Sequence, residues 1–165
     1  MLRKLFIIVF LLSLAALKSP AQEENVPVKW SLEVKSVSRN LLKDDQFNAF
    51  LSAEIEKGWH LYALEKIEGG PIPTRITIAG ELPFELGKIE APKPIEVDDA
   101  AFGVTTKFYE EAVRFTLPIK VLQSTGADAA QLQIKVRFQI CNDEMCLPPK
   151  TIVVKTSAEG QEAVK

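Results

Sequence analysis

Apolar and polar side chains alternate along most of the chain beyond residue 27. Trp30, Leu32 and Val34, for example, are separated by polar residues, which is the pattern of a strand with one buried face and one solvated face. The same period of two runs through residues 113–121 without a break. Further strands are predicted at residues 74–78, at residues 132–140 with Cys141 directly behind them, and at residues 152–154.

Residues 46–57 fit two patterns, because Phe47, Leu51 and Ile55 belong both to a period of two and to one face of a helix. We interpret this segment as a strand, since glycines and prolines divide the surrounding chain into short pieces. Many short strands with turns between them are typical of all-β proteins. The sequence therefore predicts one domain over residues 28–156, an immunoglobulin-like β-sandwich of two antiparallel sheets, and a polar tail over residues 157–165.

The first 21 residues have the features of a secretory signal peptide. A basic start at Arg3 and Lys4 is followed by an apolar run over residues 5–17. This run of 13 residues is shorter than the roughly 20 that cross a bilayer. The small residues of Ser19-Pro20-Ala21 then fit a cleavage site. We predict cleavage after Ala21, a polar leader over residues 22–27, and an exported domain that is not embedded in the membrane.

Charge and length restrict what the exported domain does. Removal of the signal peptide leaves 17 basic and 22 acidic residues, a formal charge of −5, so nucleic acid is not an expected partner. About 144 residues remain, enough for one domain with a full hydrophobic core. Such a domain does not need a disulfide in order to fold, and the presence of two cysteines needs its own explanation.

Cys141 and Cys146 are the only cysteines of the chain, and four residues lie between them. Cys141 closes a predicted strand and Cys146 precedes Pro148-Pro149, so the intervening segment must turn tightly and bring the sulfurs together. A loop this short constrains the unfolded chain by only about 2 kcal/mol, which is little for a structural disulfide. On this spacing, a redox-active pair and a structural disulfide are both open.

Other chemistries find fewer suitable residues. His60 is the only histidine and so the only histidine base for a hydrolase, yet its apolar neighbourhood fits an ordinary strand residue. Cu(I) would use the two cysteines, Met145 and His60, but the only clustered ligands are those of the turn itself. Acidic pairs such as Asp98-Asp99 and Glu110-Glu111 are typical of solvated loops. We expect neither a metal nor another cofactor.

Six segments resemble the N-terminal periplasmic domain of the disulfide reductase DsbD, also known as the disulfide bond corrector protein DsbC family. The most specific segment is residues 141–149, which places two cysteines between a strand and a double proline. The other five are residues 57–62, 69–74, 92–94, 101–104 and 107–110. The resemblance covers nearly the whole of the predicted mature chain.

This resemblance implies an immunoglobulin-like domain that exchanges thiols and disulfides. It would accept electrons from the thioredoxin-like domain of a membrane electron transporter and pass them to periplasmic thioredoxin-fold oxidoreductases, for disulfide correction or cytochrome c maturation. By the resemblance, Cys146 forms the mixed disulfide with a partner and Cys141 resolves it. Phe102 would cap the pair against chance thiols, with Gly103 as a hinge beside it.

The expected surroundings of the pair are His60, Tyr62, Tyr109, Met145 and Pro148. The chain has no Cys-x-x-Cys of the thioredoxin type, so its electrons are expected to come from another polypeptide. A second function from a different class also fits the sequence, namely a non-catalytic secreted β-sandwich binding module with a structural disulfide.

Two features differ from the best-known members of the family. The spacing between the cysteines is one residue shorter. Ala100 and Ala101 stand where those members have two carboxylates before the cap phenylalanine, and Asp98 and Asp99 lie two positions earlier.

Overall fold

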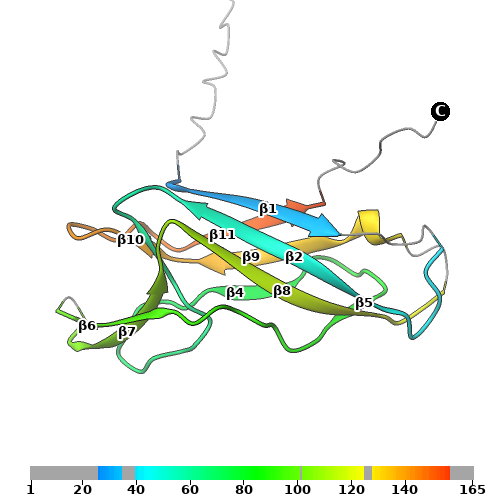
Figure 1. Ribbon diagram of the computed structural model, residues 1–165, viewed down its shortest axis with the longest axis horizontal. Helices are drawn as coiled ribbons and strands as arrows, with labels where there is room; N and C mark the ends of the chain where they lie inside the picture. The colour runs from blue at the N-terminus through cyan, green and yellow to red at the C-terminus, as the bar shows by residue number, and fades with distance from the viewer. Residues whose placement is uncertain (1–25, 35–39, 101, 125–127, 157–165) are drawn as a thin grey trace, which may run out of the picture.

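The computed structural model describes residues 26–34, 40–100, 102–124 and 128–156. The predicted signal peptide, most of the polar leader and the polar tail lie outside these residues. Nearly all regular structure within them is β-strand, with one 3₁₀-helix at Ala129–Gln131, so the all-β prediction is confirmed (Figure 1). No helix in this part of the chain is long and apolar enough to cross a membrane.

The strands form three hydrogen-bonded sheets, and neighbouring strands within each sheet are antiparallel. The first sheet has the order β1 (Val28–Val34), β2 (Gln46–Ile55), β8 (Ala112–Val121), β5 (Phe84–Leu86). The second has the order β11 (Lys150–Lys155), β9 (Gln133–Phe138), β4 (Arg75–Ile78). The third has the order β10 (Ile140–Cys141), β3 (His60–Tyr62), β7 (Val104–Tyr109), β6 (Ile95–Asp99).

The first two sheets pack into a sandwich (Figure 1). Leu51 in β2 pairs with Phe115 in β8, and both are fully buried. Trp30 in β1 connects the layers, since its ring lies 6.4 Å from that of Phe115 and 5.4 Å from that of Phe138 in β9. Burial of each such large apolar side chain contributes about 1.5–3 kcal/mol. The β-sandwich prediction is confirmed, and so is the strand assignment for residues 46–55.

The strand predicted over residues 132–140 changes sheets at Gln139. β9 ends at Phe138 and pairs with β11 and β4, whereas β10 begins at Ile140 and pairs with β3. The Gln139 side-chain oxygen accepts a hydrogen bond of 3.0 Å from the Ile72 N–H at this point. The prediction of one unbroken strand is therefore wrong, and a third sheet is added at one end of the sandwich (Figure 1).

Candidate functional site

The two faces of the third sheet pack against different groups of side chains. Leu61 of β3 and Ile140 of β10 are paired and belong to the main core. The next residues along, Tyr62 and Cys141, form a separate buried cluster with Phe108 of β7. Successive side chains of a strand point to opposite faces, so the strand that ends at Cys141 directs this side chain away from the main core.

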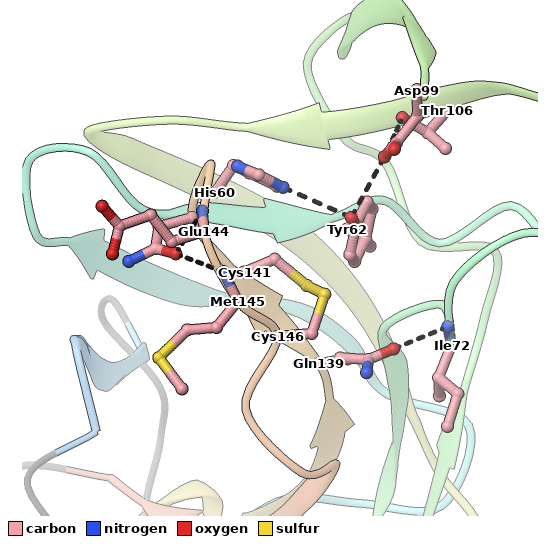
Figure 2. Close-up of a disulfide and its surroundings, with 11 residues drawn as sticks. His60, Tyr62, Ile72, Asp99, Thr106, Gln139, Cys141, Glu144, Met145 and Cys146 are labelled. Atoms are coloured by element: carbon pink, nitrogen blue, oxygen red, sulfur yellow. Dashed lines mark hydrogen bonds between the residues drawn. A yellow bond between two sulfur atoms is a disulfide. The ribbon is translucent and has the colours of Figure 1, made fainter. Parts of the chain in front are cut away.

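Cys141 and Cys146 are joined by a disulfide across a short hairpin (Figure 2). Two backbone hydrogen bonds flank the pair, from the Asn142 N–H to the Met145 carbonyl at 2.9 Å and from the Leu147 N–H to the Ile140 carbonyl at 3.0 Å. The cysteines thus occupy a non-hydrogen-bonded position, where facing Cα atoms come closest, and their Cα atoms lie 4.0 Å apart. The hairpin backbone itself therefore sets the sulfurs opposite each other.

Asn142 closes the turn of this hairpin. Its side-chain oxygen accepts hydrogen bonds from the N–H groups of Glu144 at 3.0 Å and of Met145 at 2.8 Å. Asparagine commonly stabilises tight turns in this way, because its short amide mimics a backbone carbonyl. Asn142 was not among the predicted site residues, although its position directly after a cysteine at the end of a strand is a turn signal.

The two sulfur-bearing residues differ in their access to solvent. Cys141 is 1% exposed, whereas Cys146 is exposed at the surface. Met145 is 55% exposed and Pro148 is also exposed, so both expected neighbours lie on the outer side of the hairpin. A protein that approaches from solvent therefore meets Cys146 first.

Phe102 lies against the cluster that contains Cys141. Its half-buried ring packs against this cluster and meets the Tyr62 ring edge-on at 6.1 Å between centroids. It belongs to the turn between β6 and β7, where the Asp99 carbonyl accepts hydrogen bonds from the N–H groups of Phe102 at 3.3 Å and Gly103 at 2.7 Å. Gly103 has a φ of 69°, a conformation that favours glycine.

His60 is the residue paired with Cys141 across β3 and β10. Its ring lies 4.6 Å from the ring of Phe108 and 5.3 Å from that of Tyr62. Burial disfavours the charged imidazolium and lowers the pKa of His60, against the opposing effects of Asp99, Glu110 and Asp143. The neutral imidazole therefore predominates at pH 7.

A chain of hydrogen bonds extends from His60 through Tyr62 to Asp99 (Figure 2). The Tyr62 hydroxyl lies 3.3 Å from His60 Nε2 and donates to Asp99 Oδ2 at 3.4 Å. The same carboxylate oxygen accepts from the Thr106 hydroxyl at 3.4 Å. Burial, and then the charge of Asp99, raise the pKa of Tyr62 above its usual range, so its hydroxyl remains a donor.

Asp99 is a site residue that the sequence analysis missed, because the pair Asp98-Asp99 was interpreted as a solvated loop. Both residues belong to β6, where neighbours point to opposite faces. Asp98 is exposed and accepts a hydrogen bond from Thr105, whereas Asp99 is half-buried beside Tyr62. When two adjacent carboxylates lie on one strand, one of them must point to each face of the sheet. Recognition of residues 95–99 as a strand could therefore have identified Asp99 as the carboxylate on the less exposed face.

Tyr109 is a correction to the predicted site. It was expected beside the cysteines, but it faces the main core, where its ring lies 5.8 Å from Phe115 and its hydroxyl donates to the Pro92 carbonyl at 3.1 Å. Its neighbour Phe108 takes the expected place beside Cys141. No group of three or more histidine, cysteine or acidic side chains in the described part of the chain is arranged to hold a metal ion.

Comparison with curated proteins found no match. Among solved structures, the chain is similar to the N-terminal domain of DsbD from Neisseria meningitidis in the reduced form. The TM-score is 0.52 at 18% sequence identity, and the match covers 86% of this chain and 96% of that one. This likeness supports the sandwich fold. The N-terminal periplasmic domain of ScsB from Proteus mirabilis gives a TM-score of 0.48 at 18% identity, over 78% of this chain and 45% of that one.

The family model described as "Thiol:disulfide interchange protein DsbD, N-terminal" matches residues 20–158. This range includes every described strand as well as the Cys141–Cys146 disulfide. The chain therefore belongs to the family of the N-terminal domain of the thiol:disulfide interchange protein DsbD.

Proposed function

We propose that this chain carries electrons between exported proteins by thiol–disulfide exchange at Cys141 and Cys146. The observation that carries the proposal is the asymmetry of the pair, in which one sulfur-bearing residue is exposed and the other is 1% exposed in an aromatic cluster. A structural disulfide needs no exposed member. Exchange needs one, because a partner thiolate must approach the sulfur that it attacks.

Reduction of the pair begins when a thiolate of the donor attacks the Cys146 sulfur. A mixed disulfide forms, the Cys141–Cys146 bond breaks, and its electron pair remains on the Cys141 sulfur, which takes up a proton. A second thiolate of the donor then attacks the donor sulfur in the mixed disulfide and releases Cys146, which is protonated in turn. The donor leaves oxidised, and the pair has gained two electrons and two protons.

Delivery of the electrons reverses these steps on another protein. The Cys146 thiolate attacks the disulfide of the acceptor, and Cys141 then attacks the Cys146 sulfur and releases the reduced acceptor. We propose the thioredoxin-like domain of a membrane electron transporter as donor and periplasmic thioredoxin-fold oxidoreductases as acceptors. Export by the predicted signal peptide, with cleavage after Ala21, would place the domain in the periplasm.

The half-buried Phe102 serves as a cap in this proposal. A carrier of electrons in an oxidising compartment must exclude chance thiols and disulfides, since exchange requires only a thiolate and access to a sulfur. The Phe102 ring lies against the cluster that contains Cys141. The N–H groups of Phe102 and Gly103 donate hydrogen bonds to the Asp99 carbonyl. Displacement of this ring by a bound partner would open the buried side of the pair, at Cys141, which is closed to chance thiols in the free domain.

Two measurements test the proposal. Equilibration with thiol buffers should give a reduction potential above about −300 mV, because pairs below this value resist reduction and are structural. Cys141→Ser should accumulate a mixed disulfide with a thioredoxin-fold protein through exposed Cys146, whereas the control Cys146→Ser should trap little. A potential below about −300 mV together with no trapped complex would favour the secreted binding module instead.

A further inference from the structure

We infer that the outer face of the second sheet binds a membrane surface that carries anionic lipids. The three strands of this sheet, β4, β9 and β11, contain five basic residues and no acidic residue. Four of these cations are exposed and point away from the main core, and together they are called the basic face: Arg75, Lys135, Arg137 and Lys155. The inference goes beyond the proposed exchange, because none of the four belongs to the cluster around Cys141.

The strand register gathers the basic face into one continuous surface. Arg75 of β4 lies directly opposite Arg137 of β9, and Lys135 points the same way two residues earlier in β9. Lys155 of β11 lies opposite Gln133, a further two residues along. Each cation is therefore about 5–8 Å from the next in backbone spacing, which is within the Debye length of about 8 Å at physiological salt. The positive potentials of the four side chains add together.

The charge of the basic face is not neutralised by ion pairs. None of its four cations forms a salt bridge with a residue that the structure describes. Salt bridges are formed instead by basic residues elsewhere on the surface, namely Lys66, Lys107, Arg114 and Lys120. Arg75 and Arg137 face each other as like charges, an arrangement that weakens a strand pair. A bound anionic surface would relieve this repulsion.

The side chains of the basic face favour a lipid surface over a protein partner. Protein interfaces are enriched in aromatic residues and depleted of lysine. Phe138 is the only aromatic residue of these three strands, and it is buried in the main core, whereas two lysines point outward. Lysine and arginine near an anionic bilayer are attracted to its phosphates without a fixed geometry. Val153, which is 49% exposed opposite Lys135, adds apolar area that strengthens binding to a lipid surface.

Binding through the basic face would give the domain one orientation on the membrane. The mature chain has a formal charge of −5, which opposes binding to anionic lipids through any other face. The hairpin of the Cys141–Cys146 disulfide connects β9 with β11 at one end of the second sheet (Figure 1). Its exposed acidic residues, Asp143 and Glu144, would keep the hairpin beside the lipid surface and not within it. The disulfide would then lie close to the membrane.

Flotation with lipid vesicles tests the inference on the mature chain that begins at Gln22, which keeps every residue of the main core. This protein should bind vesicles made of equal parts of phosphatidylglycerol and phosphatidylcholine, and should not bind vesicles of phosphatidylcholine alone. High salt should abolish the binding. Lys135→Gln combined with Arg137→Gln should weaken it roughly 20- to 30-fold, at about fivefold for each cation. Lys135→Arg combined with Arg137→Lys keeps the charge and should bind like the unmodified protein.

Lys29→Gln combined with Arg114→Gln is the matched control. Both residues are exposed on the outer face of the first sheet, where Lys29 lies opposite Glu54 and Arg114 forms a salt bridge with Glu33. This variant loses the same charge as the β9 double variant but should bind the anionic vesicles like the unmodified protein. Equal weakening in the two double variants, or equal binding to both kinds of vesicle, would overturn the inference.

A second double variant and a soluble polyanion complete the test. Arg75→Gln combined with Lys155→Gln lies on the other two strands and should weaken binding as much as the β9 double variant, so the test does not depend on one strand. Far-UV circular dichroism verifies that each variant keeps the β-sheet spectrum. Polyglutamate that binds the basic face as tightly as the vesicles do would indicate an acidic protein as the occupant, and would also overturn the inference.

Discussion

At the scale of single residues, the two cysteines of the disulfide lie in different surroundings, one buried and one exposed. Cys141 is buried in a cluster with Tyr62 and Phe108, against which Phe102 packs. An apolar environment disfavours a thiolate, while solvent supports one. The exposed Cys146 is therefore the sulfur suited to attack and to be attacked, and the buried Cys141 is suited to resolve the mixed disulfide.

Alkylation of the reduced protein should label Cys146 before Cys141. The physical reason is access, since Cys146 is exposed and Cys141 is 1% exposed. A short pulse of iodoacetamide followed by mass spectrometry measures the labelled fraction of each residue. Alkylation of the denatured protein is the control and should label both residues equally. Faster labelling of Cys141 in the native state would reverse the roles proposed for the two sulfurs.

Phe102→Ala should accelerate reduction of the disulfide by glutathione. Removal of the ring should make the buried Cys141 sulfur a second point of attack beside exposed Cys146. The stability should fall by less than the ~3–5 kcal/mol that a fully buried phenylalanine contributes. Phe47→Ala is the matched control, since Phe47 is also half-buried but packs against Phe84 in the sandwich. The measurements are the reduction rate and the denaturant midpoint. A destabilised Phe102→Ala protein with an unaltered rate would end the cap hypothesis.

At the scale of elements, the turn between β6 and β7 connects the cap to a stable strand pair. β6 and β7 pair along their length from Ile95 with Phe108 to Asp99 with Val104. In the turn between the two strands, the Asp99 carbonyl accepts hydrogen bonds from the N–H groups of Phe102 and Gly103. The β6–β7 pair therefore places the Phe102 ring against Tyr62 of β3.

Gly103→Ala should strain this turn and disturb the cap. Gly103 has a φ of 69° and a Cβ there would meet no atom within 4 Å, so the cost is conformational, at about 1–2 kcal/mol. Gly80→Ala is a close control, with a φ of 71° and equally open space in another turn. Denaturant unfolding should show similar losses for both variants, while glutathione reduction should change only for Gly103→Ala. Equal reduction rates would count against the hinge.

The sequence predicted long elements better than short ones. β2 and β8 each span 10 residues, enough for several cycles of alternation. β3 and β5 have three residues each, too few to establish a period, and β6 is mostly exposed on both faces. The sheet change at Gln139 was also hidden, because Phe138 and Ile140 continue the alternation and both are buried.

The sequence predicted some residues of the candidate site and not others, because several of its contacts join residues that are far apart in the chain. Chemistry and family resemblance both point to Cys141 and Cys146, whereas Phe102 and Tyr62 were predicted from the resemblance alone. The structure joins the two cysteines and packs Phe102 against the cluster of Cys141 and Tyr62. Tyr109 was misplaced because resemblance gives a segment and not a face, and the adjacent Phe108 contacts the pair instead. Asp99 was missed because its role depends on a hydrogen bond between residues 37 positions apart.

At the scale of the whole molecule, the disulfide lies outside the structure that supports the fold. The main core fills the space between the first two sheets and includes fully buried Leu51, Phe115 and Val136. The cluster around Cys141 contains only two further buried residues and lies on the other face of the third sheet. Stability and redox chemistry are therefore separated in space, which allows the pair to cycle while the domain stays folded.

Replacement of both cysteines by serine should accordingly leave the domain folded. A disulfide across so short a loop contributes about 2 kcal/mol, whereas domains of this size are stable by about 5–15 kcal/mol. The reduced unmodified protein is the control, because it lacks the bridge without any substitution. It should lose about 2 kcal/mol, and the double variant somewhat more, since Cys141→Ser introduces a hydroxyl into an apolar cluster.

Far-UV circular dichroism and denaturant unfolding measure these differences. The reduced protein and the double variant should both keep the β-sheet spectrum of the oxidised protein at room temperature and unfold at lower denaturant concentration. If both are unfolded at room temperature, the bridge is needed to hold the sandwich together. A carrier that passes through its reduced form in every cycle could not depend on such a bridge, and the structural role of the disulfide would then be favoured.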